Sequence, residues 1–250
     1  MKIDLPGRAQ FEIINKSGLR YPLADAEKDY FQTIILQLIY DSSLKDNLVF
    51  KGGTALYHCY LEQLRFSEDL DFTAPKPLEY VEINSLFEDY EIFVLKKLEE
   101  RKYSVNITVQ YRGILSQPNS VRIDINTNQK VLLPPKVLEY RNNYGLQVKC
   151  KVMDVREIAA EKIRALNERP KPRDLYDLYL VGKYFDLGMK EVVDLLRKKE
   201  MFLPLTKQRI SDNCNAALEA FENEIERLYY REATSKDELK TIAKQVVESL

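Results

Sequence analysis

The chain of 250 residues carries 38 Lys and Arg residues against 39 Asp and Glu residues, so its formal net charge is −1. This balance excludes a strongly basic protein whose overall field attracts nucleic acid or anionic lipid, and any nucleic-acid site must be a local basic patch. The three cysteines are far apart and odd in number, which argues against a disulfide framework or a zinc knuckle and favours a reduced, cytoplasmic setting. No segment has the pattern of a signal peptide or a membrane span, and we expect no membrane contact.

The first part of the chain has a mixed pattern of helices and strands. Apolar residues recur at helical spacing after Ala26, and short alternating runs bounded by Gly, Pro and Asn indicate strands. The expected helices here cover residues 26–44, 55–64 and 79–101, and the expected strands cover residues 48–51, 69–72, 104–112, 120–126 and 145–152.

From Asp154 onward the apolar spacing is almost entirely helical. The expected helices cover residues 155–166, 172–184 and 190–197, followed by two long helices that reach the C-terminus. We therefore predict an α+β protein with two domains, a mixed sheet with flanking helices over residues 1–153 and a helical domain over residues 154–250.

A short acidic strand is the first feature that suggests chemistry. Ser67, Asp69 and Asp71 are two residues apart, so they line one face of an extended segment, while Leu70 and Phe72 face the core. Two carboxylates on one rigid face are suitable ligands for Mg²⁺, which binds oxygen and keeps substrate phosphates in its shell. The alternative is a half-exposed strand with acids on its wet face, although aspartate is a poor strand former.

A double glycine precedes this strand. Gly52 and Gly53 permit positive φ and a close approach of the backbone to a ligand, and Thr54 is a candidate cap for the following helix. Free N–H groups at such a helix start bind phosphate. The turn lacks the G-K-[ST] ending of a Walker A loop, and a simple tight turn would also require glycine.

Together, K-G-G-T-A-L (residues 51–56) and R-F-S-E-D-L-D-F (residues 65–72) resemble motif I of the AbiEii/AbiGii-type nucleotidyltransferase toxins, a branch of the DNA-polymerase-β-like superfamily. The resemblance implies a polymerase-β-like nucleotidyltransferase sheet in the first domain and a helical second domain that completes the active-site cleft. It also implies that Asp69 and Asp71 bind Mg²⁺ or Mn²⁺. The nucleotide-binding residues that it implies are Lys51, Gly52, Gly53, Thr54, Arg65, Ser67 and Lys162.

A second stretch, residues 156–180, is similar to the family's helix with a functional lysine followed by R-D-x-x-D. By this resemblance Lys162 contacts the nucleotide phosphates, and Asp174 or Asp177 completes the catalytic group. The residues alone leave other interpretations open. Lys162 suits a surface position beside an apolar helix face, and Asp174 suits the first turn of a helix that Pro172 begins.

Two further residues have open roles. Asp124, in V-R-I-D-I, faces away from Ile123 and Ile125 and is a candidate general base for the attacking hydroxyl. A motif-III Asp is the alternative for that role. His58, the only histidine, has no evident catalytic partner, so we expect it to be a packing or surface residue.

The sequence therefore predicts a metal-dependent nucleotidyltransferase that transfers NMP from an NTP to an acceptor hydroxyl. The resemblance implies the toxin of a type IV toxin–antitoxin or abortive-infection system, with a tRNA 3′ end or another RNA as the acceptor and an antitoxin protein as a partner. The alternatives are a non-catalytic nucleotide- or partner-binding protein of the same fold, and transfer of NMP or phosphate to a protein.

Overall fold

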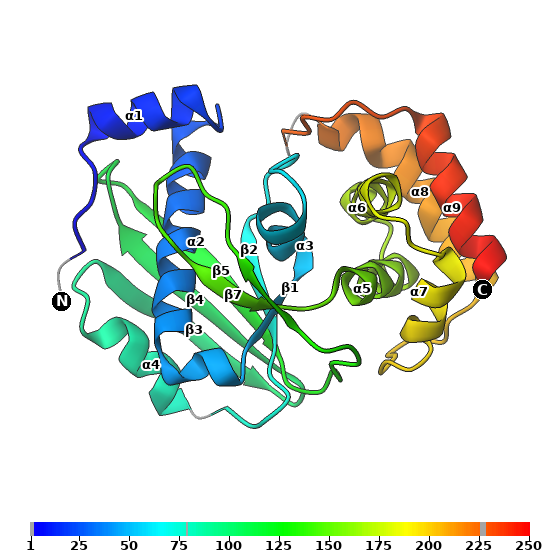
Figure 1. Ribbon diagram of the computed structural model, residues 1–250, viewed down its shortest axis with the longest axis horizontal. Helices are drawn as coiled ribbons and strands as arrows, with labels where there is room; N and C mark the ends of the chain where they lie inside the picture. Colours follow the sequence, from blue (N-terminus) through cyan, green and yellow to red (C-terminus); the bar gives the residue numbers. More distant parts are fainter. Residues whose placement is uncertain (1–2, 79, 226–228) are drawn as a thin grey trace. The chain divides into compact units, whose positions relative to one another are not determined.

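Figure 1 shows the computed structural model, which describes residues 3–78, 80–225 and 229–250. The chain divides into two compact units. The first unit comprises Met1–Cys59, Glu68–Gln129 and Pro135–Val152, and the second comprises Tyr60–Ser67, Lys130–Pro134 and Met153–Leu250. Two short segments of the first 153 residues are thus grouped with the C-terminal helices.

The first unit is built on a seven-stranded mixed sheet with strand order β3-β4-β5-β2-β1-β7-β6. The strands are β1 Val49–Lys51, β2 Asp69–Thr73, β3 Phe93–Arg101, β4 Ser104–Arg112, β5 Pro118–Asn126, β6 Lys136–Glu139 and β7 Lys149–Val152. Strand β2 lies in the middle, antiparallel to β1 and parallel to β5. The predicted α+β class with a mixed sheet is confirmed.

Helix α2 (Leu23–Asp41) packs on the sheet against β5 and β7 (Figure 1), because its apolar residues recur at helical spacing. The core between them is rich in aromatic rings. Phe31 stacks on Tyr111 with ring centroids 3.8 Å apart, and Phe50 contacts Phe72 across β1 and β2. This packing holds β2 as a rigid central strand, with its other face free to carry polar side chains.

The predicted helix over residues 79–101 is wrong in its second half. Helix α4 (Tyr80–Glu88) ends near Asp89, and the following residues form the edge strand β3, antiparallel to β4. Glu79, the predicted start, lies outside the described residues. The charged run from Lys96 to Arg101 is compatible with an exposed helix or with an edge strand, since both tolerate charge. Pairing with β4 decides in favour of the strand.

Other elements also differ from prediction. Helix α1 (Arg8–Ser17) and strand β6 were not expected, and the turn before β5 falls at residues 113–117 rather than 117–119. The helix after the glycine turn begins at Gly52, whereas the predicted helix begins at Ala55. It runs as α3 (Gly52–Ala55) and continues as a π-helix, Leu56–Tyr60. A short 3₁₀ helix, Ser43–Asp46, follows α2.

The second unit is helical. Its helices are α5 Val155–Glu168, α6 Pro172–Tyr184, α7 Met189–Leu196, α8 Lys207–Ile225 and α9 Lys236–Ser249. Helix α5 packs against α6, α7 and α8, and α9 packs against α6, α7 and α8. Within the described part of the chain, no helix is both long and apolar enough to cross a membrane.

Candidate active site

The glycine turn and the acidic strand lie next to each other in the first unit. Strand β1 pairs with β2 so that Lys51 is opposite Asp71, and Gly52 follows with φ of 78°. A Cβ atom on Gly52 would overlap the Asp71 carboxylate, whose Cβ and Cγ would be 2.9 Å away. Glycine is therefore required here by both the backbone conformation and the carboxylate beside it.

We expect Gly52→Ala to lower the free energy of unfolding by about 2–4 kcal/mol, since it adds left-handed strain to an overlap with Asp71. It also displaces that carboxylate from its place beside the glycine turn. Gly145→Ala is the matched control, because Gly145 has φ of 73° and no atom within 4 Å of the added Cβ. Urea unfolding of both variants measures the difference, and equal losses would show that the overlap with Asp71 has no effect.

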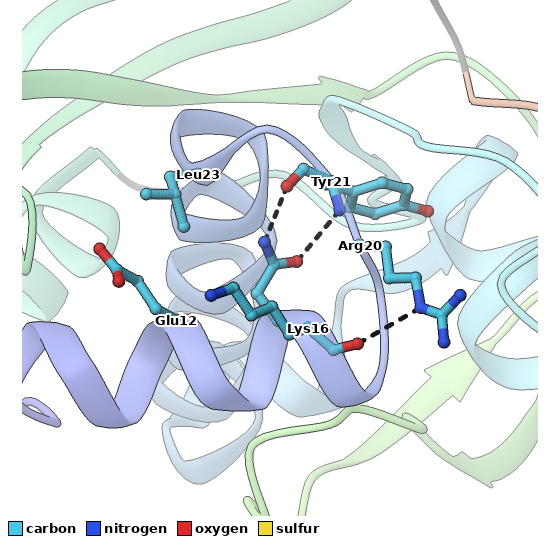
Figure 2. A pocket seen from close by; sticks show the side chains of 6 residues that line it. Glu12, Lys16, Arg20, Tyr21 and Leu23 are labelled. Carbon is cyan, nitrogen blue, oxygen red and sulfur yellow. Dashed lines mark hydrogen bonds between the residues drawn. The ribbon is translucent and has the colours of Figure 1, made fainter.

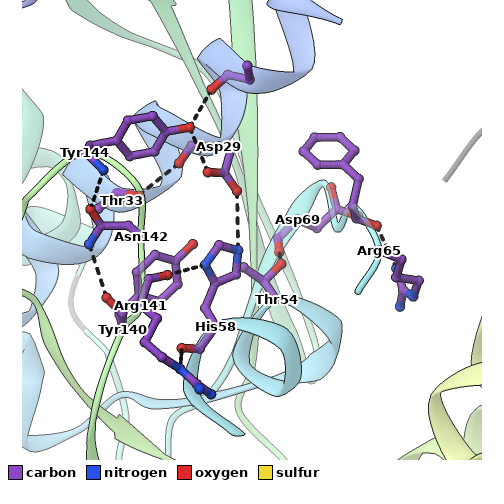
Figure 3. A network of polar contacts seen from close by, with 12 residues as sticks. Asp29, Thr33, Thr54, His58, Arg65, Asp69, Tyr140, Arg141, Asn142 and Tyr144 are labelled. Atoms are coloured by element: carbon purple, nitrogen blue, oxygen red, sulfur yellow. Dashed lines mark hydrogen bonds and ion pairs between the residues drawn. The ribbon is translucent and has the colours of Figure 1, made fainter. Parts of the chain in front are cut away.

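Thr54 joins the first turn of α3 to the start of β2. Its buried hydroxyl donates a hydrogen bond of 2.6 Å to the Asp69 carbonyl oxygen. It is not the helix cap that its position suggested, because α3 begins two residues earlier. The bond holds the glycine turn beside the acidic strand (Figure 3).

Three carboxylates share one face of the sheet. Leu70 and Phe72 are fully buried, so Asp69 and Asp71 lie on the opposite face of β2. Strand β5 runs parallel with Asp71 in register with Asp124. This register brings residues 53 positions apart in the chain to adjacent positions, and Asp69 and Asp124 are both partly exposed.

Arg122 also belongs to this group and was not predicted. It is in register with Asp69, and its Nη2 donates to Asp69 Oδ2 at 2.6 Å, while Nε lies 3.4 Å from Asp124 Oδ2. Asn106 donates to the other oxygen of Asp124. The hydrogen bond and charge of Asp69 raise the pKa of the Arg122 guanidinium. The sequence V-R-I-D-I could have indicated Arg122, because alternation along a strand puts Arg122 and Asp124 on one face.

The donor set matches a hard divalent cation, because Asp69, Asp71 and Asp124 all supply carboxylate oxygens. Among the described residues, no three side chains of ligand type already surround one point. Arg122 donates to Asp69, and Asn106 donates to Asp124. The chemistry of the residues fits Mg²⁺ or Mn²⁺.

Four other predicted residues, Arg65, Lys162, Asp174 and Asp177, form a buried ionic cluster in the second unit. Lys162 Nζ lies 3.0 Å from Asp174 Oδ1 and 2.6 Å from Asp177 Oδ2. Arg65 donates to both carboxylate oxygens of Asp177, from Nε to Oδ1 at 2.8 Å and from Nη2 to Oδ2 at 2.7 Å. Both aspartates are fully buried, and Arg169 Nε donates to Asp174. The alternative of a surface position for Lys162 is wrong, because α6 places two carboxylates against α5.

Charge compensation keeps this cluster ionised. Burial opposes ionisation of Asp177, but the charges of Arg65 and Lys162 outweigh it and hold the pKa of that carboxyl below its usual range. Burial likewise opposes the charge of Lys162, and Asp177 and Asp174 outweigh it, so the pKa of Lys162 is raised. A favourable position at the start of α6 does not by itself explain Asp174, because its carboxylate forms ion pairs with the side chains of Lys162 and Arg169.

His58 is a packing residue, as expected. Its ring stacks on Tyr140, Nδ1 donates to the Arg141 carbonyl oxygen at 2.8 Å, and Nε2 lies 3.3 Å from Asp29 of α2 (Figure 3). Tyr144 donates to the other oxygen of Asp29. The network ties the helix after the glycine turn to α2, and this supports the position of the turn.

A pocket of about 530 Å³ lies elsewhere in the first unit, where α1 meets the start of α2 (Figure 2). Asn15 forms two hydrogen bonds with the backbone of Tyr21 there, and Arg20 donates to the carbonyl oxygen of Lys16. Arg20 has φ of 55°, and its guanidinium caps the C-terminal end of α1. None of the lining residues was predicted as a site residue. They are Glu12, Asn15, Lys16, Arg20, Tyr21 and Leu23.

Comparison with known proteins gave one family match and several structural matches. The model of the nucleotidyl transferase AbiEii toxin family of type IV toxin–antitoxin systems matches residues 34–244. No match was found among curated proteins.

Two solved structures illustrate the similarity of fold. JHP933 from Helicobacter pylori is 18% identical with a TM-score of 0.58, and the match covers 90% of this chain and 92% of that one. The nucleotidyltransferase toxin MenT4 from Mycobacterium tuberculosis is 18% identical with a TM-score of 0.58, covering 96% of this chain and 87% of that one. At this identity the two likenesses describe the fold alone.

Proposed function

Because this chain belongs to the AbiEii family of nucleotidyltransferase toxins of type IV toxin–antitoxin systems, we propose that it transfers NMP from an NTP to a hydroxyl of RNA with the help of Mg²⁺ or Mn²⁺. The observation that carries the proposal is the register of β1, β2 and β5. It sets Gly52 against Asp71 and puts Asp124 beside Asp71 on the same face.

Five residues of the first unit have defined tasks in this proposal. Asp69 and Asp71 would hold the divalent ion, which would neutralise phosphate charge. Gly52 leaves room for phosphates beside Asp71, and Thr54 keeps the turn in place through Asp69. Asp124 accepts the proton of the acceptor hydroxyl as that oxygen attacks the α-phosphorus and pyrophosphate leaves.

The other nucleotide-binding and catalytic residues stay predictions that rest on the family resemblance. Lys51 is buried opposite Asp71. Ser67 lies two residues before the start of β2 and belongs to the second unit. The further members of this set are Gly53, Arg65, Lys162, Asp174 and Asp177.

The acceptor and the partner are proposed from the family setting. We place RNA first, with the 3′ end of tRNA as the specific acceptor, and expect an antitoxin protein to oppose the activity in a cytoplasmic setting. With a net charge of −1, the chain must recognise RNA through local contacts instead of an overall positive field.

The proposal is tested by the fate of the label. The purified full chain is incubated with Mg²⁺, total tRNA and each NTP, labelled at the α or the γ phosphorus, with EDTA as the control. We expect the α-label to become attached to RNA. We expect no such transfer in the reaction that contains EDTA. Transfer of γ-label alone indicates a phosphotransferase, label on protein indicates a protein acceptor, and binding without transfer indicates a non-catalytic protein; each of these results contradicts the proposal.

A further inference from the structure

Arg122 contacts one proposed metal ligand, Asp69, and the proposed general base, Asp124. Its guanidinium bridges the two strands, since Nη2 is 2.6 Å from Asp69 Oδ2 on β2 and Nε is 3.4 Å from Asp124 Oδ2 on β5. We propose that Arg122 is a positioning residue that acts as a resident counter-cation for Asp69 and Asp124 and must leave them when a divalent ion binds. This inference rests on the proposed function, because it concerns the metal of that reaction.

The backbone determines that this contact forms. Strands β2 and β5 are parallel with Asp69 in register with Arg122 and Asp71 in register with Asp124. Alternation puts all four side chains on the same face of the sheet. Arg122 therefore has one carboxylate directly opposite and another two residues along its own strand, and it contacts both.

The exposure of Arg122 makes the contact reversible. Its side chain is 56% exposed, so water and salt screen its ion pairs and keep them weak. Arg65, whose side chain is 3% exposed, grips Asp177 in a bidentate pair and is a fixed structural ion pair by contrast. A divalent ion with two charges is able to displace the exposed guanidinium but not the buried one.

The consequence is a low metal affinity in the absence of nucleotide. Three carboxylates on one face repel one another and would attract a cation strongly, but the guanidinium offsets part of that charge. Mg²⁺ is commonly held by one or two carboxylates together with substrate phosphates. The ion therefore binds mainly with the NTP, whose phosphates supply the ligands that offset the loss of the Arg122 contacts.

The test is a titration of the full chain with Mn²⁺ alone, followed by electron paramagnetic resonance of the free ion. We expect Arg122→Ala to lower the Kd for Mn²⁺ about tenfold, since it removes one unit charge within 4 Å of the ligand oxygens. Arg122→Lys keeps the charge and is expected to shift the Kd less. Arg101→Ala is the matched control, because Arg101 is an exposed arginine of the same sheet that pairs with Glu99 instead. We expect the Kd of this variant for Mn²⁺ to equal that of wild type.

An unchanged or higher Kd in Arg122→Ala, with the fold intact by circular dichroism, would overturn the inference. A second check adds Asp69→Asn to Arg122→Ala. Loss of the tighter binding supports the inference, and retention shows that the ion binds elsewhere and overturns it. The Mn²⁺ titration does not involve NMP transfer. A lower Kd in a chain that transfers no label would refute the proposed function alone, and an active chain with an unchanged Kd would refute only the role of Arg122.

Discussion

Asp71→Asn is expected to retain the fold and lose NMP transfer by about a thousandfold, equal to about 4 kcal/mol of transition-state stabilisation. Asn keeps the size of the side chain beside Gly52 but removes the negative charge. Asp71 lies between Lys51 on β1 and Asp124 on β5 in register, so its carboxylate is at the centre of the proposed site. The measurement is the rate of α-label transfer at saturating Mg²⁺, together with the melting temperature.

Glu68→Gln is the matched control for this variant. Glu68 is three residues away, precedes β2, and pairs with Lys28 at 3.5 Å with its side chain 53% exposed. Removing its charge is expected to leave the rate within a factor of about two, since exposed pairs contribute little. Full activity in Asp71→Asn, or an equal loss in both variants, would refute the assignment of the metal to the β2 aspartates.

Asp177→Asn is expected to have the largest effect on stability, a loss of about 3–5 kcal/mol in the free energy of unfolding. The substitution leaves Arg65 and Lys162, both buried, with the charge of Asp174 alone. Urea unfolding at neutral pH measures the loss. Asp194→Asn is the control, because Asp194 makes an exposed pair with Arg197 within one helix turn. A loss below about 1 kcal/mol in Asp177→Asn would contradict the structural role of the cluster.

Wild type and Asp177→Asn are also expected to differ in how their stability depends on pH in the acid range. The pKa of Asp177 is depressed in the folded chain by the charges of Arg65 and Lys162, which outweigh its burial. Its contribution is therefore complete above the unfolded pKa of about 3.9 and is lost as the pH falls toward the folded value. Wild type is expected to lose stability steeply below about pH 4, and Asp177→Asn less steeply; parallel curves would contradict this assignment.

Local patterns were sufficient where the chemistry is encoded within a few residues. The alternation of Asp69 to Phe72 predicted a strand with one acidic face, and the structure has this strand with Leu70 and Phe72 fully buried. Pro172 and the apolar spacing after it predicted α6 with its observed bounds. In both cases the residues that define the element lie within one strand or a few helix turns.

Prediction failed where pairing between distant segments decides the structure. Residues 93–101 carry enough charge to suit an exposed helix, yet they form β3 because β4 offers a partner strand. The surface position that was an alternative for Lys162 is wrong for the same reason, because α6 covers it with Asp174 and Asp177, while its role at the nucleotide stays a prediction. Helix propensity and local polarity describe a segment by itself and carry no information about partners that are distant in the sequence.

The sequence by itself determined the kinds of residues in the candidate site: a glycine turn, an aspartate pair two residues apart, and a lysine helix followed by R-D-x-x-D, enough to indicate the family. The tertiary structure alone decided which of them meet. Strand register placed Asp124 and Arg122 beside the aspartate pair, and helix packing closed Arg65, Lys162, Asp174 and Asp177 into one buried cluster. The physical reason is that side-chain period is a local property, whereas register and charge pairing depend on segments up to 112 residues apart.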